Sequence, residues 1–142
     1  MRATDAKKVP PRTATSGARD VRTLVVDDQL PVRDALRELV GVTPGFHLVG
    51  EVCSGEDAIV AVDTVSPHLV LMDVRMPGIG GIEAASRLAH QHPEVFVILI
   101  SVHGADELPP ELVKGTEDAT FVYKQALRPR LLRQLWEDRQ GR

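Results

Sequence analysis

The chain has 142 residues, 43% of them hydrophobic, and a formal net charge of −3 at pH 7. This is enough apolar material for one domain with a real core. No apolar stretch reaches the roughly 18 residues of a membrane span, and no apolar signal-peptide core follows the N-terminus. The single cysteine, Cys53, cannot form an internal disulfide, which agrees with the cytoplasmic location that we expect.

The charges are unevenly distributed. Residues 1–22 hold six Lys/Arg and two Asp, residues 23–127 hold six Lys/Arg and sixteen Asp/Glu, and residues 128–142 hold five Arg and two acids. The acidic body argues against a nucleic-acid-binding domain and favours a cation site or a basic partner. Residues 1–20 lack periodicity and are predicted to be a disordered basic tail, with the folded domain at 21–140. Contact of this tail with nucleic acid or anionic lipid is the alternative.

Strand and helix patterns alternate along the rest of the chain. The strands are predicted at Arg22–Asp27, His47–Val52, Leu69–Asp73, Val95–Ile100 and Phe121–Tyr123. Helices are predicted from Pro31 to about Val40, after an N-cap at Ser54, from about Gly81 to Gln91, and at Leu127–Arg139. A fourth helix would begin at Pro109 or later and be short or irregular.

This alternation predicts an α/β fold made of right-handed βαβ units. For this length, a doubly wound five-stranded parallel sheet in the flavodoxin-like order 2-1-3-4-5 fits best. In that order the first and third strands are neighbours, so Asp27, Asp28 and Asp73 meet at the carboxyl edge of the sheet. Three like charges there need protons, a cation or a phosphoryl group to compensate them.

Four motifs in this order carry a family resemblance: Leu-Val-Val-Asp-Asp at 24–28, Val-Leu-Met-Asp-Val-Arg-Met-Pro-Gly at 70–78, Ile-Leu-Ile-Ser at 98–101 and Phe-Val-Tyr-Lys at 121–124. The chain from about Val21 to Arg139 resembles the receiver domain of two-component response regulators. Residues 44–51 look like receivers of the NarL/LuxR type, which precede a helix-turn-helix output domain. The resemblance therefore implies a cytoplasmic phosphoprotein of two-component signalling and transcription regulation.

The resemblance also implies the chemistry. Asp73 would accept a phosphoryl group from a phosphohistidine of a sensor histidine kinase. Mg²⁺, which prefers oxygen ligands, would be held by Asp28, Asp73 and the main-chain carbonyl of Arg75. Asp27 would bind the ion directly or through water.

Three further residues take roles by resemblance. Lys124 would contact the phosphoryl oxygens as a point charge, and Ser101 would donate its hydroxyl to them. Ser101 and Phe121 would then act as the switch that changes the surface of helix four, strand five and helix five, a possible homodimer interface. The chain would be a signalling switch and not an enzyme, apart from its own phosphorylation and dephosphorylation. No DNA-binding domain follows Arg142 in this sequence, so we expect either a regulator that acts alone through protein contacts or one piece of a longer regulator.

Several positions depart from the family pattern. Gly80 replaces the usual acidic residue and makes the loop 78–81 more flexible. Val102 replaces a small residue, Glu117-Asp118-Ala119-Thr120 replaces a glycine-rich turn, and Phe121 lacks a hydroxyl. These departures gather around helix four and strand five, so the chemical centre is expected to be intact and the output face unusual.

Other interpretations remain open. The chain could be a receiver-like interaction module that acts independently of phosphorylation, or a small phosphatase with Asp73 as nucleophile. Asp27 and Asp28 could merely cap a helix, and Asp73 could be a turn residue. Cys53 is predicted to be a buried filler, and Trp136 to pack the last helix onto the sheet.

Overall fold

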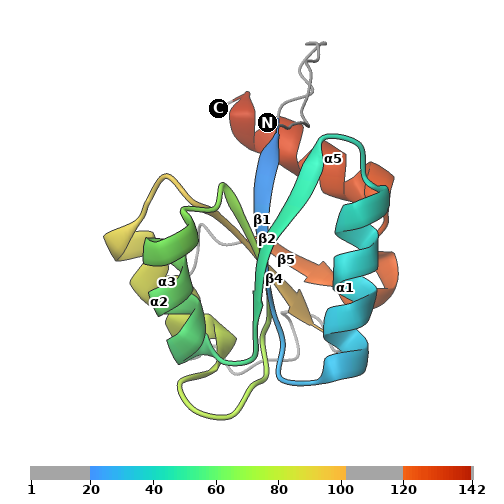
Figure 1. Ribbon diagram of the computed structural model, residues 1–142. Helices are drawn as coiled ribbons and strands as arrows, with labels where there is room; N and C mark the ends of the chain where they lie inside the picture. Colours follow the sequence, from blue (N-terminus) through green and yellow to red (C-terminus); the bar gives the residue numbers. More distant parts are fainter. Residues whose placement is uncertain (1–19, 102–119, 142) are drawn as a thin grey trace, which may run out of the picture.

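A computed structural model describes residues 20–101 and 120–141, and within them a five-stranded parallel sheet forms the centre of the domain (Figure 1). The strand order is β2-β1-β3-β4-β5, as predicted from the alternation of elements. The strands are β1 (Val21–Val26), β2 (Phe46–Val52), β3 (Leu69–Asp73), β4 (Phe96–Ser101) and β5 (Thr120–Tyr123). Residues 1–19 of the predicted tail and the predicted fourth helix lie outside the described residues.

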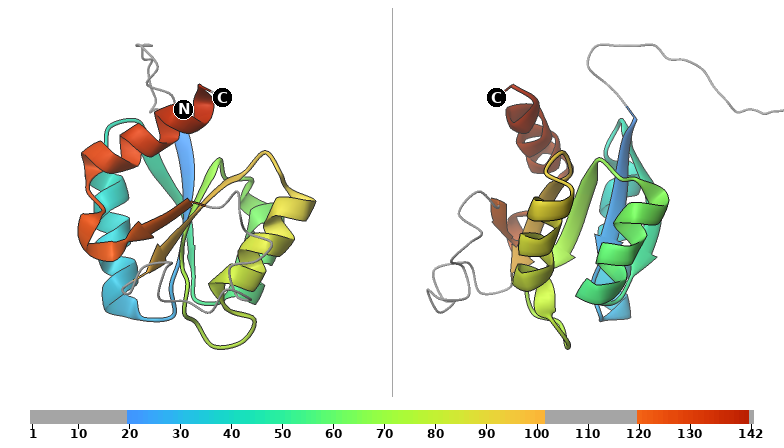
Figure 2. Two further views of the ribbon diagram at one scale, coloured as in Figure 1. Left: turned by 180° about the vertical axis from the view of Figure 1, so that it is seen from behind. Right: turned by 90° about the vertical axis from the view of Figure 1, so that its left-hand side faces the viewer.

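Helices cover both faces of this sheet. They are α1 (Leu30–Val42), α2 (Gly55–Val65), α3 (Gly80–Gln91) and α5 (Pro129–Gln140), with a short 3-10 helix, η2 (Lys124–Ala126), before α5. Figures 1 and 2 show α1 and α5 on one face and α2 and α3 on the other. The doubly wound α/β architecture is therefore confirmed. No helix in the described ranges has the length and apolar character that would let it cross a membrane.

Each face of the sheet has its own hydrophobic core, because successive side chains of a strand point to opposite faces. On the α2–α3 face, Leu24 and Val26 pack with Val62 and Leu88. On the α1–α5 face, the intervening Val25 belongs to the second cluster, whose buried members are Val21, Val25, Leu36, Val40, Phe46, Leu69, Leu71, Phe96, Ile98, Ile100, Val122 and Leu132. The near-continuous apolar runs of the strands follow from burial on both sides.

The register of the strands aligns their carboxyl ends. Val26 pairs with Met72, so the residues after them, Asp27 and Asp73, are neighbours across β1 and β3. Ser101 pairs with Tyr123, which places Lys124 one residue further along the same edge. The ends of four different strands therefore bring four of the predicted site residues to a single edge: Asp27, Asp73, Ser101 and Lys124.

Two local expectations can be compared directly. Ser54 caps α2 as predicted, with its Oγ accepting a hydrogen bond from the Asp57 N–H at 3.0 Å. The last helix was predicted from Leu127 but begins at Pro129, because η2 and an extended Arg128 intervene and Pro129 takes the first turn. Proline suits that position, since its missing N–H would have no partner there.

The prediction for Cys53 was wrong. Cys53 follows β2 and is exposed, because the strand has ended and the chain is turning into α2. The prediction for Trp136 is confirmed: its ring meets Phe46 edge-on at 6.5 Å between centroids and lies 6.4 Å from Phe96. Both phenylalanines begin strands, so Trp136 packs α5 against the amino end of the sheet, opposite the acidic edge.

Candidate phosphoryl-acceptor and metal site

The acidic edge brings three carboxylates together. One oxygen from each of Asp27, Asp28 and Asp73 lies within 4.8 Å of the others. Asp27 is buried, with 3% of its surface exposed, whereas Asp73 is partly buried and Asp28 is exposed. Asp28 therefore faces solvent at the mouth of the site, and Asp73 and Asp27 form its interior.

The arrangement perturbs the protonation of the two inner carboxyls. The pKa of Asp73 is raised from 3.8 to about 6, first by burial and then by the charge of Asp27, against the lowering effect of the Arg75 and Val74 N–H groups. Burial also raises the pKa of Asp27, which the hydrogen bond from the Gln29 N–H to Oδ1, at 2.9 Å, partly offsets. The site thus holds more negative charge than its surroundings neutralise, as expected of a site that receives a cation.

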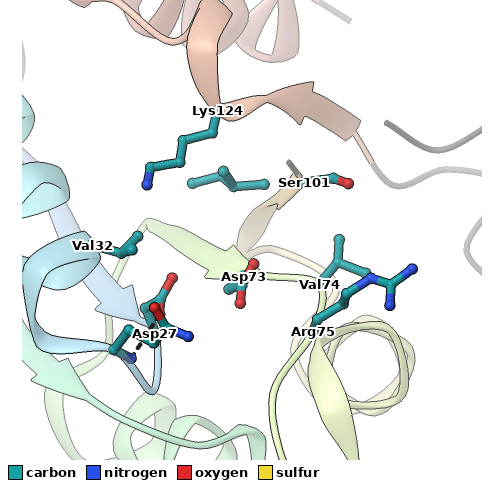
Figure 3. Close-up of a pocket in the computed structure, with 9 residues that line it drawn as sticks. Asp27, Val32, Asp73, Val74, Arg75, Ser101 and Lys124 are labelled. Atoms are coloured by element: carbon teal, nitrogen blue, oxygen red, sulfur yellow. Dashed lines mark hydrogen bonds between the residues drawn. The ribbon is translucent and has the colours of Figure 1, made fainter. Parts of the chain in front are cut away.

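A pocket extends from these carboxylates to the end of β5 (Figure 3). Ser101, which is 3% exposed, ends β4, and Lys124 begins η2. Figure 3 shows Lys124 extended along the side of the pocket opposite Asp27, with the Ser101 hydroxyl turned away from the Asp73 carboxylate. The lining residues are Asp27, Gln29, Val32, Asp73, Val74, Arg75, Ile100, Ser101 and Lys124.

The loop between β3 and α3 is held close to Asp73. The Gly81 N–H donates to the Val74 carbonyl at 3.0 Å, and a Cβ on Gly81 would lie 2.0 Å from the Asp73 carbonyl oxygen, so only glycine fits. Gly80, at the position where an acidic residue is usual, has a φ of +78°, a region that glycine adopts without strain. Glu56 of α2 accepts a hydrogen bond from the Ile79 N–H at 3.3 Å. The loop 78–81, for which greater flexibility is predicted, is thus hydrogen-bonded to α2 at Ile79 and to Val74 at Gly81.

The residues present fit a hard divalent cation. Carboxylate and carbonyl oxygens are the ligands that Mg²⁺ prefers, and the described cluster supplies three carboxylates without a competing thiolate or imidazole. Arg75 lines the same pocket, and its side chain points away from Asp73 in Figure 3. Of the predicted metal ligands, the three carboxylates of Asp27, Asp28 and Asp73 therefore meet at one place.

Phe121 lies elsewhere. It pairs with Leu99 in the sheet and packs against the core of the α2–α3 face, partly buried, instead of lining the pocket. Sequence reasoning missed Arg33, whose Nη1 donates to the Asp27 carbonyl at 2.9 Å. Its signal in the sequence is weak: a single arginine one turn into α1. Sequence reasoning also missed Glu56, because a single glutamate in the first turn of α2 looks like any charged residue near a helix start.

A family model, the response regulator receiver domain, matches residues 23–135. The chain belongs to this family. As a receiver domain it is a signalling switch rather than an enzyme, and its acidic cluster agrees with the phosphorylation site of such domains.

Individual receivers give the same result. The response regulator GacA of Pseudomonas protegens is 38% identical over 95 residues, 67% of this chain and 45% of the relative. The solved signal receiver domain of NarL from Mycobacterium tuberculosis has a TM-score of 0.73 at 25% identity, covering 87% of this chain and 99% of that one. The solved structure of a LuxR-family two-component response regulator from Aurantimonas sp. SI85-9A1 has a TM-score of 0.69 at 28% identity, covering 82% of each chain. The chain spans less than half the length of GacA.

Proposed function

We propose that this receiver domain accepts a phosphoryl group on Asp73 from a phosphohistidine of a sensor histidine kinase and then changes its protein contacts. The observation that carries the proposal is the meeting of three carboxylates within 4.8 Å, two of which, Asp27 and Asp73, line a pocket together with Lys124 and Ser101. A nucleophile, a cation site and donors for phosphoryl oxygens thus surround one cavity. The phosphatase alternative needs substrate-binding residues that this lining does not offer.

The chemical step is a transfer between two side chains. An Asp73 carboxylate oxygen forms a bond to phosphorus, the phosphorus–nitrogen bond of the donor breaks, and its electron pair remains on the imidazole, which takes up a proton. Because the pKa of Asp73 is raised to about 6, most of the carboxyl is ionised at neutral pH and can act as the nucleophile. Burial holds it in place while keeping it a better base than an ordinary aspartate.

The remaining residues would position the phosphoryl group and neutralise its negative charge. Bound Mg²⁺, held by Asp28, Asp73 and the Arg75 carbonyl with Asp27 direct or through water, would supply positive charge to the phosphoryl oxygens. Lys124 would supply a second positive charge from the end of β5. Electrostatic stabilisation and positioning account for most of the catalysis of phosphoryl transfer.

The switch would act through β4 and β5. In the unphosphorylated form the Ser101 hydroxyl is turned away from Asp73, so reaching a phosphoryl group requires it to move inward. Phe121 lies one strand away and is only partly buried, which leaves it able to follow. This is a local charge change that biases a packing element, with a coupling on the order of 1–3 kcal/mol. The helix four, strand five and helix five face, with homodimerisation as one outcome, is the proposed output.

We place the receiver at residues 21–140 and the basic segment 1–20 outside it. Since the matched part covers less than half of GacA, the output of such longer regulators, including the transcription regulation typical of LuxR-type proteins, enters only as part of the proposal. We expect the cognate sensor kinase to present its phosphohistidine in the cytoplasm.

Intact mass after incubation with Mg²⁺ and a small acyl-phosphate donor tests the proposal. Wild type is expected to gain one phosphoryl group, Asp73→Asn none, and Lys124→Ala to gain it more slowly. Glu38→Gln, an exposed change on α1, should behave as wild type. No gain in a folded wild-type protein would refute the proposal and favour an interaction module that is independent of phosphorylation. In that case partner binding would be the same for wild type and Asp73→Asn.

A further inference from the structure

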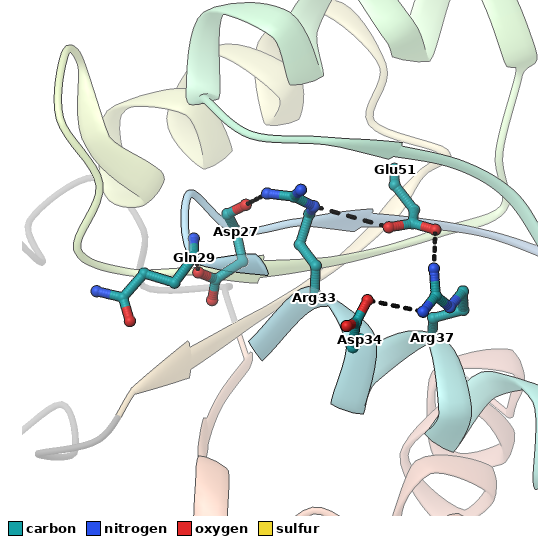
Figure 4. Close-up of polar contacts among 6 residues, drawn as sticks. All are labelled: Asp27, Gln29, Arg33, Asp34, Arg37 and Glu51. Carbon is teal, nitrogen blue, oxygen red and sulfur yellow. Dashed lines mark hydrogen bonds and ion pairs between the residues drawn. The ribbon is translucent and has the colours of Figure 1, made fainter. Parts of the chain in front are cut away.

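The Asp27 backbone is held on both sides by other parts of the chain (Figure 4). Its N–H donates to the Val52 carbonyl of β2 at 3.1 Å. Its carbonyl accepts a hydrogen bond from Arg33 Nη1 at 2.9 Å, and its Oδ1 accepts one from the Gln29 N–H at 2.9 Å. The peptide that joins Asp27 to Asp28 is therefore fixed by the Arg33 side chain.

Arg33 is itself held. Its Nε lies 3.6 Å from Oε1 of Glu51 on β2, and the two side chains are only 19% and 24% exposed. The other oxygen of Glu51 bonds Arg37 Nη1 at 3.1 Å, and Arg37 also pairs with Asp34 at 2.7 Å. Glu51 thus orients both arginines, but Arg33 has the bond to the Asp27 carbonyl.

We propose that Arg33 is a positioning residue of the receiver site: it fixes the Asp27–Asp28 peptide so that both carboxylates are presented to a divalent cation and, in consequence, to phosphoryl transfer on Asp73. The inference rests on the proposed function. Partners that orient metal ligands affect affinity although they never touch the ion. A guanidinium suits this task because its planar fork reaches the carbonyl and Glu51 at once, which a lysine ammonium does with less directional control.

The direction in which Mg²⁺ affinity changes when Arg33 is replaced distinguishes a positioning role from a purely electrostatic one. Arg33 lies close enough to lower the pKa of Asp27, so its positive charge also opposes a cation in the pocket. If Arg33 were only a nearby charge, replacing it with a neutral residue would strengthen Mg²⁺ binding. If it positions the two carboxylates, the same replacement weakens binding.

The test is isothermal titration calorimetry with Mg²⁺ at about pH 8, well above the raised pKa of about 6 of Asp73. Arg33→Gln removes the charge and the fork, and Arg33→Lys keeps the charge and removes the fork. Arg37→Gln is the matched control, because Arg37 binds the same Glu51 but, among the described residues, pairs with Asp34 and not with Asp27. Thermal unfolding of each variant, with β-sheet content from circular dichroism, confirms that it is folded.

We expect the Mg²⁺ dissociation constant to rise about tenfold in Arg33→Gln and in Arg33→Lys, and to stay within about twofold of wild type in Arg37→Gln. The phosphorylation rate by the acyl-phosphate donor should fall in the same two variants and recover at higher Mg²⁺. Tighter or unchanged Mg²⁺ binding in Arg33→Gln, or equal weakening in Arg37→Gln, would overturn the inference. Failure of wild type to bind Mg²⁺ or to accept a phosphoryl group would instead overturn the proposed function.

Discussion

Replacing Asp73 with asparagine should stabilise the metal-free protein at neutral pH. The carboxyl has a pKa raised from 3.8 to about 6, first by burial and then by the charge of Asp27. The folded state therefore binds this proton more tightly than the unfolded chain. Its contribution to stability is present below about pH 4 and is lost as pH rises through about 6. At neutral pH the ionised group opposes folding, and asparagine, which has nearly the same shape, removes that cost.

The magnitude follows from the same values. The difference between 3.8 and about 6 corresponds to about 3 kcal/mol at about 1.4 kcal/mol per pH unit. Because Asp73 is only partly buried, solvent screening reduces this, and we expect a gain of about 1–2 kcal/mol in the free energy of unfolding. At about pH 4 the gain should shrink to a fraction of that value.

Urea unfolding in the presence of EDTA, followed by Trp136 fluorescence, measures the gain at about pH 7.5 and about pH 4. Glu38→Gln is the control for net charge, since Glu38 is exposed on α1. With saturating Mg²⁺ the order should reverse, because wild type gains binding free energy that the asparagine variant lacks. A destabilised Asp73→Asn in EDTA, or a gain that does not depend on pH, would refute the electrostatic reasoning.

Three more measurements probe the scaffold. Gly81→Ala should lower the free energy of unfolding by at least about 2 kcal/mol, because its Cβ would lie 2.0 Å from the Asp73 carbonyl oxygen. Gly41→Ala, whose Cβ would meet open space, should raise the free energy of unfolding by about 0.5–1 kcal/mol. Urea unfolding that ranks the two variants in the opposite order would contradict this. Ser54→Ala should cost about 1 kcal/mol through the lost α2 cap, and an unchanged urea midpoint would show that the cap contributes nothing. The pKa of His92 is raised, chiefly by its hydrogen bond to Asp63. The stability lost in Asp63→Asn should therefore be largest below the ordinary pKa of 6.5 and vanish as pH rises through the raised pKa of His92. A loss of melting temperature that does not depend on pH would argue against this ion pair.

The location of the site is predictable from the sequence because it depends on strand order and on which residue ends each strand. Once β1 and β3 are neighbours, Asp27 and Asp73 must meet, whatever the surrounding side chains do. Ser101 and Lys124 follow by the same logic, since they end β4 and follow β5. Element order is recorded in hydrophobic periodicity, which is a local property of the chain.

The supports of the site are not predictable in this way. The bond from Arg33 to the Asp27 carbonyl depends on how α1 is set against β1 and β2, and an arginine on a helix surface otherwise looks like any solvated charge. The exposure of Cys53 depends on where β2 ends, and the late start of α5 depends on η2 forming first. Element boundaries and contacts between a side chain and a distant backbone group require the packed structure.

The central claim is that Asp73 carries the phosphoryl group, and the most direct test is to locate that group. After reaction with Mg²⁺ and an acyl-phosphate donor, borohydride reduction converts an aspartyl phosphate to homoserine, which peptide mass spectrometry assigns to one position. The account predicts homoserine at position 73 and at no other aspartate. Homoserine at Asp27 or Asp28, or no conversion in a protein that binds Mg²⁺, would contradict it.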